Sequence, residues 1–115
     1  MRIVDSRNKL NLTELRQMAE DMFGDLVKAV VDVNKGIMAI DGELHADEEA
    51  LLIENGSDQN DLWGINLYPE LESGDFVEYD SMINLRPSQG NRGRGVENPE
   101  IRARIQLIVA ALVIR

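Results

Sequence analysis

The stretch Leu26-Val-Lys-Ala-Val-Val-Asp-Val-Asn-Lys-Gly-Ile-Met-Ala-Ile40 decides the fold of this chain of 115 residues. Its first half alternates, with four aliphatic side chains between Val27 and Val33 on one face, which is typical of a strand with one buried side. Asn34-Lys-Gly36 is typical of a tight hairpin turn, and Ile37-Met-Ala-Ile40 follows as a returning strand. Because a short turn joins antiparallel neighbours, this stretch predicts an antiparallel sheet.

Helical patterns lie before, between and after the predicted strands. The first helix is predicted over residues 11–24, with Asn11 and Glu14 forming a capping box at its start. A second is predicted over residues 46–55, where acidic side chains in the first turn interact favourably with the helix dipole. The last helix is predicted over residues 99–114, because Asn-Pro-Glu is a strong helix start.

Two further strands are predicted at residues 62–67 and 76–85, which gives the order α-β-β-α-β-β-α. This order predicts a single α+β domain over residues 1–115, with a mainly antiparallel four-stranded sheet and the helices packed on one face. Asn66 and Asn84 fall on the polar faces of the last two strands. They either face solvent or line a shallow pocket beside Arg86.

The composition is that of an ordinary globular protein, with 43% apolar and 29% charged residues. Cysteine is absent, which excludes disulfides, thiolate metal sites and cysteine nucleophiles. The N-terminal residues have no apolar core like that of a signal peptide, and the longest apolar run, residues 107–114, is too short to span a bilayer. We therefore expect a cytoplasmic protein without a membrane partner.

The net charge of −9 is unevenly distributed. No lysine or arginine occurs between Gly36 and Leu85, and arginines then follow in quick succession from Arg86. An acidic chain is a poor partner for extended nucleic acid. A local arginine cluster on such a chain suits one compact anion, or it pairs with the protein's own carboxylates.

The segment Arg86-Pro-Ser-Gln-Gly-Asn-Arg-Gly-Arg-Gly95, here called the arginine loop, combines cations, neutral donors and glycines just before a helix start. Arginine matches phosphate and carboxylate with paired hydrogen bonds, and a helix N-terminus favours anions. We therefore predict a binding or regulatory protein with a site for a small phosphate- or carboxylate-bearing ligand. The predicted ligand-binding residues are Arg86, Ser88, Gln89, Asn91, Arg92 and Arg94.

Two alternatives stay open. His45 is the only histidine, and with Glu43 it is the candidate acid-base group of a hydrolase or phosphotransfer enzyme. Glu43, Asp47 and Asp80 would then be candidate ligands of a divalent metal ion, which would be the cofactor of such an enzyme. In the other alternative, the acidic middle of the chain forms a face that meets a basic protein partner.

The last predicted helix is apolar on nearly all sides from Ile105 to Ile114. A helix of that kind is buried or shared with a second subunit, and so small a domain has little interior to surround it. We therefore expect a homodimer formed through this helix.

Several blocks of the chain resemble a family of small uncharacterised prokaryotic proteins, a domain of unknown function with no assigned activity. The resemblance covers almost the whole chain and implies a complete single-domain protein. It implies no catalytic residue. The blocks are Met22-Phe-Gly-Asp-Leu-Val-Lys-Ala-Val-Val-Asp32, Gly42-Glu-Leu-His-Ala-Asp-Glu-Glu-Ala50, Leu62-Trp-Gly-Ile-Asn-Leu-Tyr-Pro69 and Ile83-Asn-Leu-Arg-Pro-Ser-Gln-Gly-Asn-Arg-Gly-Arg-Gly-Val-Glu97.

Overall fold

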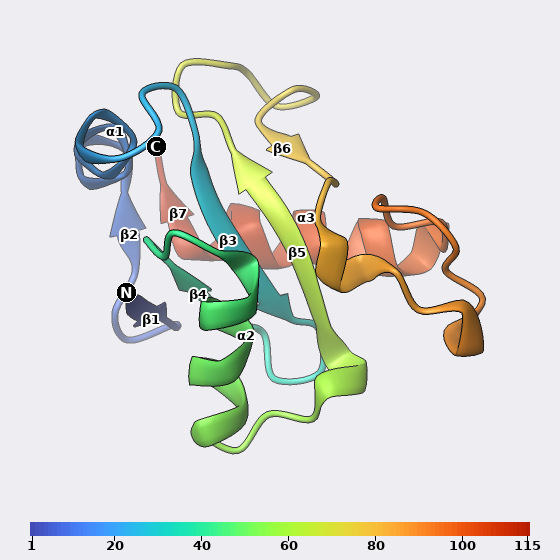
Figure 1. The fold of residues 1–115 in the computed structure, drawn as a ribbon. Coiled ribbons are helices and arrows are strands. Elements are labelled where there is room, and N and C mark those ends of the chain that lie inside the picture. Colours follow the sequence, from blue (N-terminus) through green and yellow to red (C-terminus); the bar gives the residue numbers. More distant parts are fainter.

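The computed structural model describes all residues from Met1 to Arg115. Its main sheet has five strands in the order β1-β4-β3-β5-β6, and every neighbouring pair is antiparallel (Figure 1). The strands are β1 (Arg2–Val4), β3 (Val27–Asp32), β4 (Ile37–Ile40), β5 (Leu62–Leu67) and β6 (Val77–Glu78). The predicted α+β class and mainly antiparallel sheet are confirmed, and β1 is an additional strand.

The helices are α1 (Leu12–Asp21), α2 (His45–Glu54) and α3 (Pro99–Leu112). A short parallel pair, β2 (Leu10–Asn11) and β7 (Val113–Ile114), joins the segment before α1 to the end of α3. Strands of two residues leave no alternating pattern, which is why the sequence did not predict this pair. None of the three helices combines the length and apolar character that crossing a membrane requires.

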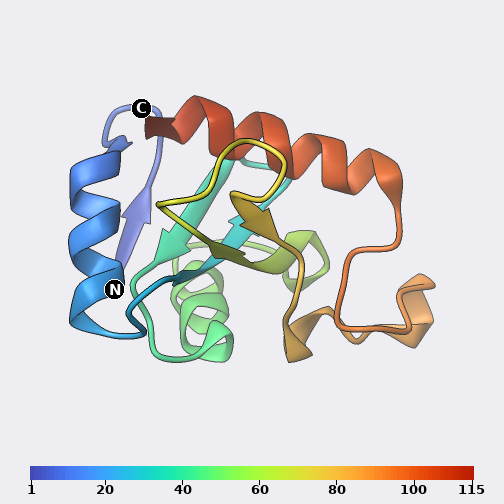
Figure 2. The same cartoon turned by 90° about the horizontal axis from the view of Figure 1, so that it is seen from above.

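The helices are divided between the two faces of the sheet, whereas the sequence predicted all of them on one face (Figure 2). α1 and α3 share one core with the sheet residues Ala29, Val31 and Ile65. α2 lies on the opposite face, where its Leu52 packs with Val30 and its neighbours. The central strands carry apolar side chains on both faces, so each face needs a cover of its own.

The capping signals are confirmed where the sequence placed them. The main-chain N–H of Glu14 donates to the side chain of Asn11 at 2.8 Å, and the Glu14 carboxylate accepts from the Asn11 N–H at 3.2 Å. Asn98 caps α3 in the same way, accepting from the N–H of Glu100 at 2.8 Å. Such caps depend only on residues a few positions apart, so they can be predicted without knowledge of the tertiary structure.

The predicted strand over residues 76–85 is much shorter in the structure. β6 ends at Glu78, and a short 3₁₀ helix, Met82–Asn84, then lies against β5. Gly64 makes this approach possible, because a Cβ there would lie only 2.5 Å from the Cβ of Ser81. The Asn84 amide completes the contact by accepting from the Gly64 N–H at 2.8 Å and donating to its carbonyl at 2.9 Å.

α3 uses part of its apolar surface within the chain. Its buried residues are Ile105, Ile108, Val109 and Leu112. Leu107 points outward and is 66% exposed. The homodimer through this helix stays a prediction, and Leu107 is the side chain that such a contact would cover.

Candidate functional site

Arg86 of the arginine loop bonds to main-chain atoms of the fold and also lines a polar cavity. Its Nε donates to the carbonyl of Ile83 at 3.1 Å, and its Nη2 donates to the carbonyl of Leu62. The guanidinium stacks over the ring of Trp63 at 4.6 Å and lies 3.6 Å from the carboxylate of Glu49. Burial lowers the pKa of Arg86, and Glu49 opposes this effect. The ligand role of Arg86 stays a prediction; in the structure its side chain ties the 3₁₀ helix Met82–Asn84 to β5.

Asn91 is also structural. Its side chain is buried, and its Nδ2 lies within hydrogen-bond distance of the carbonyls of Asn84, Gly93 and Gly95, at 2.7, 3.2 and 2.8 Å. Its Oδ1 accepts from the N–H of Glu97 at 2.8 Å. Because both ends of the amide are already bonded to the main chain, Asn91 closes the arginine loop and has nothing left to offer a ligand.

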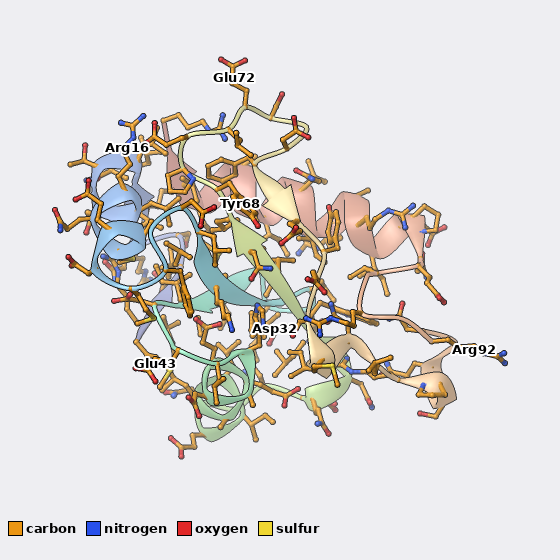
Figure 3. The ribbon with its side chains drawn as sticks, turned by 45° about the horizontal axis from the view of Figure 1, so that its top comes forward. Arg16, Asp32, Glu43, Tyr68, Glu72 and Arg92 are labelled. Atoms are coloured by element: carbon orange, nitrogen blue, oxygen red, sulfur yellow. The ribbon has the colours of Figure 1, made fainter.

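The other predicted ligand residues do not converge on one point. Arg94 pairs with Asp80 at 2.6 Å, and Arg92 is exposed and points away from the body of the molecule (Figure 3). Arg86, Ser88 and Gln89 border a polar cavity of about 330 Å³, but Glu49 also lines it and would repel an anion. The alternative that the arginines pair with the acidic middle of the chain fits Arg86 and Arg94.

A larger cleft lies on the face of the sheet that carries α2, and it is here called the α2 cleft. α2 covers only part of this face and leaves the ends of β3, β5 and β6 uncovered beyond its first turn (Figure 1). The cleft has a volume of about 590 Å³. Its lining residues come from the segment after α1, β3, the start of α2, β5, β6 and the 3₁₀ segment, with one from the arginine loop: Phe23, Leu26, Lys28, Leu44, His45, Ala46, Asn66, Tyr68, Glu78, Asp80, Ser81, Met82, Ile83 and Arg94.

The floor of the α2 cleft is a polar row that crosses three strands. Lys28, Asn66 and Glu78 are register partners on β3, β5 and β6. The Asn66 Nδ2 donates to the Glu78 carboxylate at 2.8 Å and to the Asp80 carbonyl at 3.3 Å, and the Tyr68 hydroxyl donates to the same Glu78 oxygen at 3.0 Å. Since both partners of the amide nitrogen are acceptors, the Asn66 orientation is fixed. Its buried Oδ1 has no hydrogen-bond partner.

His45 sits beside this row at the first residue of α2. Its Nε2 donates to the carbonyl of Ile65 at 2.8 Å, and the residue is 8% exposed. Burial is the main cause that lowers the pKa of His45, with Lys28 acting in the same direction. The hydrogen bond to Ile65, then Asn66 and Asp80, oppose it. The ring is therefore neutral near pH 7, with its proton on Nε2 and an acceptor lone pair on Nδ1.

Two carboxylates of the α2 cleft are held in place by their neighbours. Glu78 receives the hydrogen bonds of Asn66 and Tyr68 on Oε1, and Asp80 receives the Arg94 guanidinium on Oδ1. The second oxygen of each carboxylate has no partner within the chain. The cleft therefore presents oriented acceptors with free capacity.

The mouth of the α2 cleft is apolar. Phe23, Leu44 and Met82 come from three different elements and are 40%, 55% and 61% exposed. The ammonium of Lys28 lies 4.9 Å from the centre of the Phe23 ring, a cation-π contact at the same rim. A ligand that fits this shape carries a polar group toward the floor and an apolar part at the mouth.

A family model for proteins of unknown function, DUF5674, matches residues 3–112 and so includes the α2 cleft and the arginine loop. The chain belongs to this family. No curated protein and no solved structure matches the chain.

The metal set predicted for the enzyme alternative does not assemble in this DUF5674 chain. No three histidine, aspartate or glutamate side chains come together in a way that could hold an ion. Glu43 and Asp47 are exposed and do not line the α2 cleft, whereas His45 and Asp80 do. The acid-base role of His45 with Glu43 stays a prediction; in the structure the imidazole donates to a main-chain carbonyl, and the acids that line the same cleft are Glu78 and Asp80.

The sequence missed the relation between Lys28, Asn66 and Glu78. The alternation of β3 and β5 placed Lys28 and Asn66 on polar faces, but their pairing depends on which strands are neighbours and in which register. Asn84, which the sequence paired with Asn66, is fully buried and bonded to Gly64 instead. The pattern of a single sequence does not give the register between neighbouring strands, and that register brings Lys28, Asn66 and Glu78 together.

Proposed function

We propose that this DUF5674 protein binds a small organic cation, an amine with an apolar substituent, in the α2 cleft. The observation that carries the proposal is the pair of oriented carboxylates, Glu78 and Asp80, each with one oxygen bonded within the chain and one free. Together with an apolar mouth, they form a site with a charged floor and a hydrophobic entrance.

An ammonium group fits the hydrogen-bonding capacity of the floor. The free oxygens of Glu78 and Asp80 and the Nδ1 lone pair of His45 are all acceptors. An ammonium has only donors to offer, and charge-assisted hydrogen bonds to carboxylates are about twice as strong as neutral ones. Of the two cations in the lining, Arg94 is paired with Asp80. The side chain of Lys28 extends from the floor row to the rim, where its ammonium lies 4.9 Å from the centre of the Phe23 ring.

Binding is better supported than catalysis. The one hydroxyl group of a serine in the cleft, that of Ser81, is 1% exposed and accepts from the N–H of Ile83 at 3.3 Å. His45 has no carboxylate partner that would orient it as the base of a nucleophilic pair, because its Nε2 donates to Ile65. The cleft thus offers recognition groups without an activated nucleophile.

The experiment compares ligands that differ only in their polar head. Hexylamine should raise the melting temperature in a thermal-shift assay, because a ligand that binds only the native state stabilises it. Hexanol and inorganic phosphate should leave it unchanged. Isothermal titration calorimetry then gives the affinity for hexylamine.

Glu78→Gln keeps an acceptor oxygen for Asn66 and Tyr68 while removing the negative charge. We expect it to weaken hexylamine binding by a factor of about ten or more. Glu72→Gln is the matched control, because Glu72 is an exposed acid that lies away from the cleft (Figure 3). Stabilisation by phosphate that disappears in Arg92→Ala would contradict the proposal and return the site to the arginine loop.

A further inference from the structure

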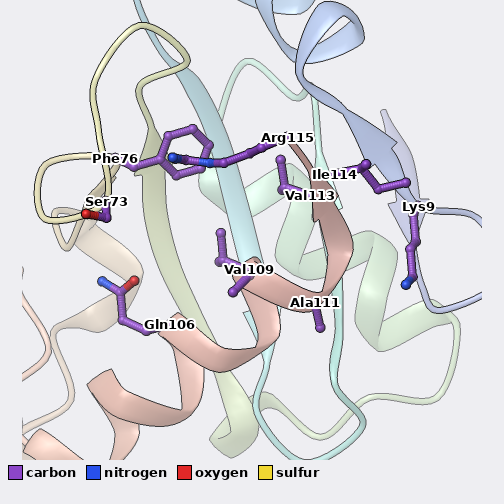
Figure 4. Close-up of a pocket in the computed structure, with 10 residues that line it drawn as sticks. Lys9, Ser73, Phe76, Gln106, Val109, Ala111, Val113, Ile114 and Arg115 are labelled. Carbon is purple, nitrogen blue, oxygen red and sulfur yellow. The ribbon is translucent and has the colours of Figure 1, made fainter.

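A third cavity lies on the other side of the molecule, between the C-terminal half of α3, β7 and the segment before β6 (Figure 4). It is here called the α3 groove, and its volume is about 510 Å³. Phe76, Val109, Val113 and Ile114 supply most of its apolar lining. None of its lining residues belongs to the α2 cleft, so a ligand of the α3 groove is independent of the proposed function.

Two cations without carboxylate partners flank this apolar surface. The Arg115 guanidinium stacks 4.1 Å from the centre of the Phe76 ring, and Lys9 lies on the opposite side of the groove (Figure 4). Neither side chain has an ion pair or a hydrogen bond to another residue, and no acidic side chain lines the groove. In a chain of net charge −9, four other arginines are paired with carboxylates: Arg2, Arg16, Arg86 and Arg94.

The stacking on Phe76 determines which hydrogen bonds the Arg115 guanidinium can still donate. The aromatic ring covers one face of the flat guanidinium, while the N–H groups lie at its edge. Those edges match a carboxylate, which accepts two parallel hydrogen bonds from an arginine. The Ser73 hydroxyl, which also lines the groove at the Phe76 end, adds a neutral donor (Figure 4).

We propose that the α3 groove binds a single-chain carboxylate, with its head at Arg115 and Ser73 and its alkyl tail along Val109, Val113 and Ile114. The volume of the groove lies within the range of sites for small molecules. Burial of the tail supplies the affinity, since each buried methylene contributes favourably. The head-group contact supplies the selection of an anion over a cation.

The test measures binding of decanoate by isothermal titration calorimetry, below the concentration at which micelles form. Nonyltrimethylammonium has the same alkyl tail with the opposite charge, and acetate is a carboxylate without the tail. We expect decanoate to bind at least ten times more tightly than either. Arg115→Gln should weaken decanoate at least fivefold, and Arg92→Gln, which removes the same charge from the exposed arginine loop, should not.

Ala111→Glu gives a second variant that does not depend on the packing of Arg115. Ala111 is exposed on α3 and lines the groove, so the substitution places a carboxylate there with the fold preserved. Decanoate binding should be lost, and the melting temperature without ligand should stay within the range of other surface variants.

Three results would overturn the proposal. The first is equal binding of the two charged heads, and the second is no binding of decanoate. The third concerns a second copy of the chain as the occupant. In that case the second copy fills the α3 groove, and sedimentation shows a dimer that Leu107→Glu converts to a monomer. Decanoate then binds to the monomeric variant but not to the dimer. If the protein associates with anionic lipid vesicles but does not bind monomeric decanoate, the result counts as the second of these outcomes.

Discussion

The arginine loop and the α2 cleft differ in how well the sequence indicates their role. The loop contains residues that are typical of ligand sites, yet Arg86 and Asn91 bond to main-chain atoms and Arg94 pairs with Asp80. The cleft is built from residues far apart in the sequence, yet Glu78 and Asp80 keep free acceptor oxygens. What matters is whether a polar group already has a partner within the chain.

Two ionisable groups inside the fold extend this comparison. Arg86 is partly buried, Leu62 and Ile83 accept hydrogen bonds from its Nη2 and Nε, and Glu49 lies nearby, while its Nη1 has no partner. Glu48, on α2, is fully buried and accepts only the Gly42 N–H, at 2.9 Å. Burial raises the pKa of Glu48 to about 9, so the native state keeps it protonated. Glu49 offsets part of the burial of the Arg86 charge, whereas Glu48 has no counter-charge of this kind and is held neutral.

Arg86→Ala should have the largest effect. It would leave the carbonyls of Leu62 and Ile83 without a donor and Glu49 without a counter-charge, close to Trp63. Leaving a polar group inside the fold without its hydrogen-bond partner costs about 1 to 3 kcal/mol, and we expect a loss of at least about 2 kcal/mol in the free energy of unfolding measured with urea. Arg16→Ala, which breaks only the exposed pair with Glu70, is the control.

A loss below about 1 kcal/mol in Arg86→Ala would show that the loop is not held by its arginine. The comparison between a structural loop and a free cleft would then fail. In that case Arg86 would again be available as a ligand residue.

Glu48→Gln should stabilise the protein at high pH. Between the usual value of 4.5 and the native value of about 9, the unfolded chain loses the Glu48 proton while the native state keeps it. The native state thus binds more protons, and its stability falls as pH rises through this window. Glutamine resembles the protonated acid, so we expect a gain of roughly 3 kcal/mol at pH 8 that shrinks toward zero near pH 5.

Urea unfolding of both proteins at several pH values measures this difference. A gain that does not change with pH would mean that Glu48 has the same pKa in the native and unfolded states, so that it is ionised in both above its ordinary value. Glu54→Gln, at the exposed end of the same helix, is the matched control and should show little pH dependence.

Arg92→Ala should have the smallest effect. The side chain is exposed and makes no ion pair or hydrogen bond, so the free energy of unfolding should change by less than about 0.5 kcal/mol. Hexylamine binding in the α2 cleft should also stay unchanged. A stability loss well above 1 kcal/mol would show that this end of the loop, too, is part of the folded framework.

Local patterns predicted much of the fold. The hairpin of β3 and β4, the capping box of Asn11 and Glu14, and the Asn98 cap of α3 all appear where the sequence placed them. Where the predictions differ from the structure, the cause is a contact between distant segments. β6 is short because the 3₁₀ segment packs against Gly64, and α2 takes the second face of the sheet because Val30 needs a cover.

The sequence by itself determined the α+β class, the hairpin, the helix starts and the acidic character of the chain. Each of these depends on composition or on residues a few positions apart. Only the tertiary structure decided which polar groups are free. It brought Asn66 beside Glu78 through the register of β5 and β6, and it turned Arg86 toward Leu62. A side chain's capacity to bind a ligand depends on its spatial neighbours, and those are fixed only when strands pair and segments pack.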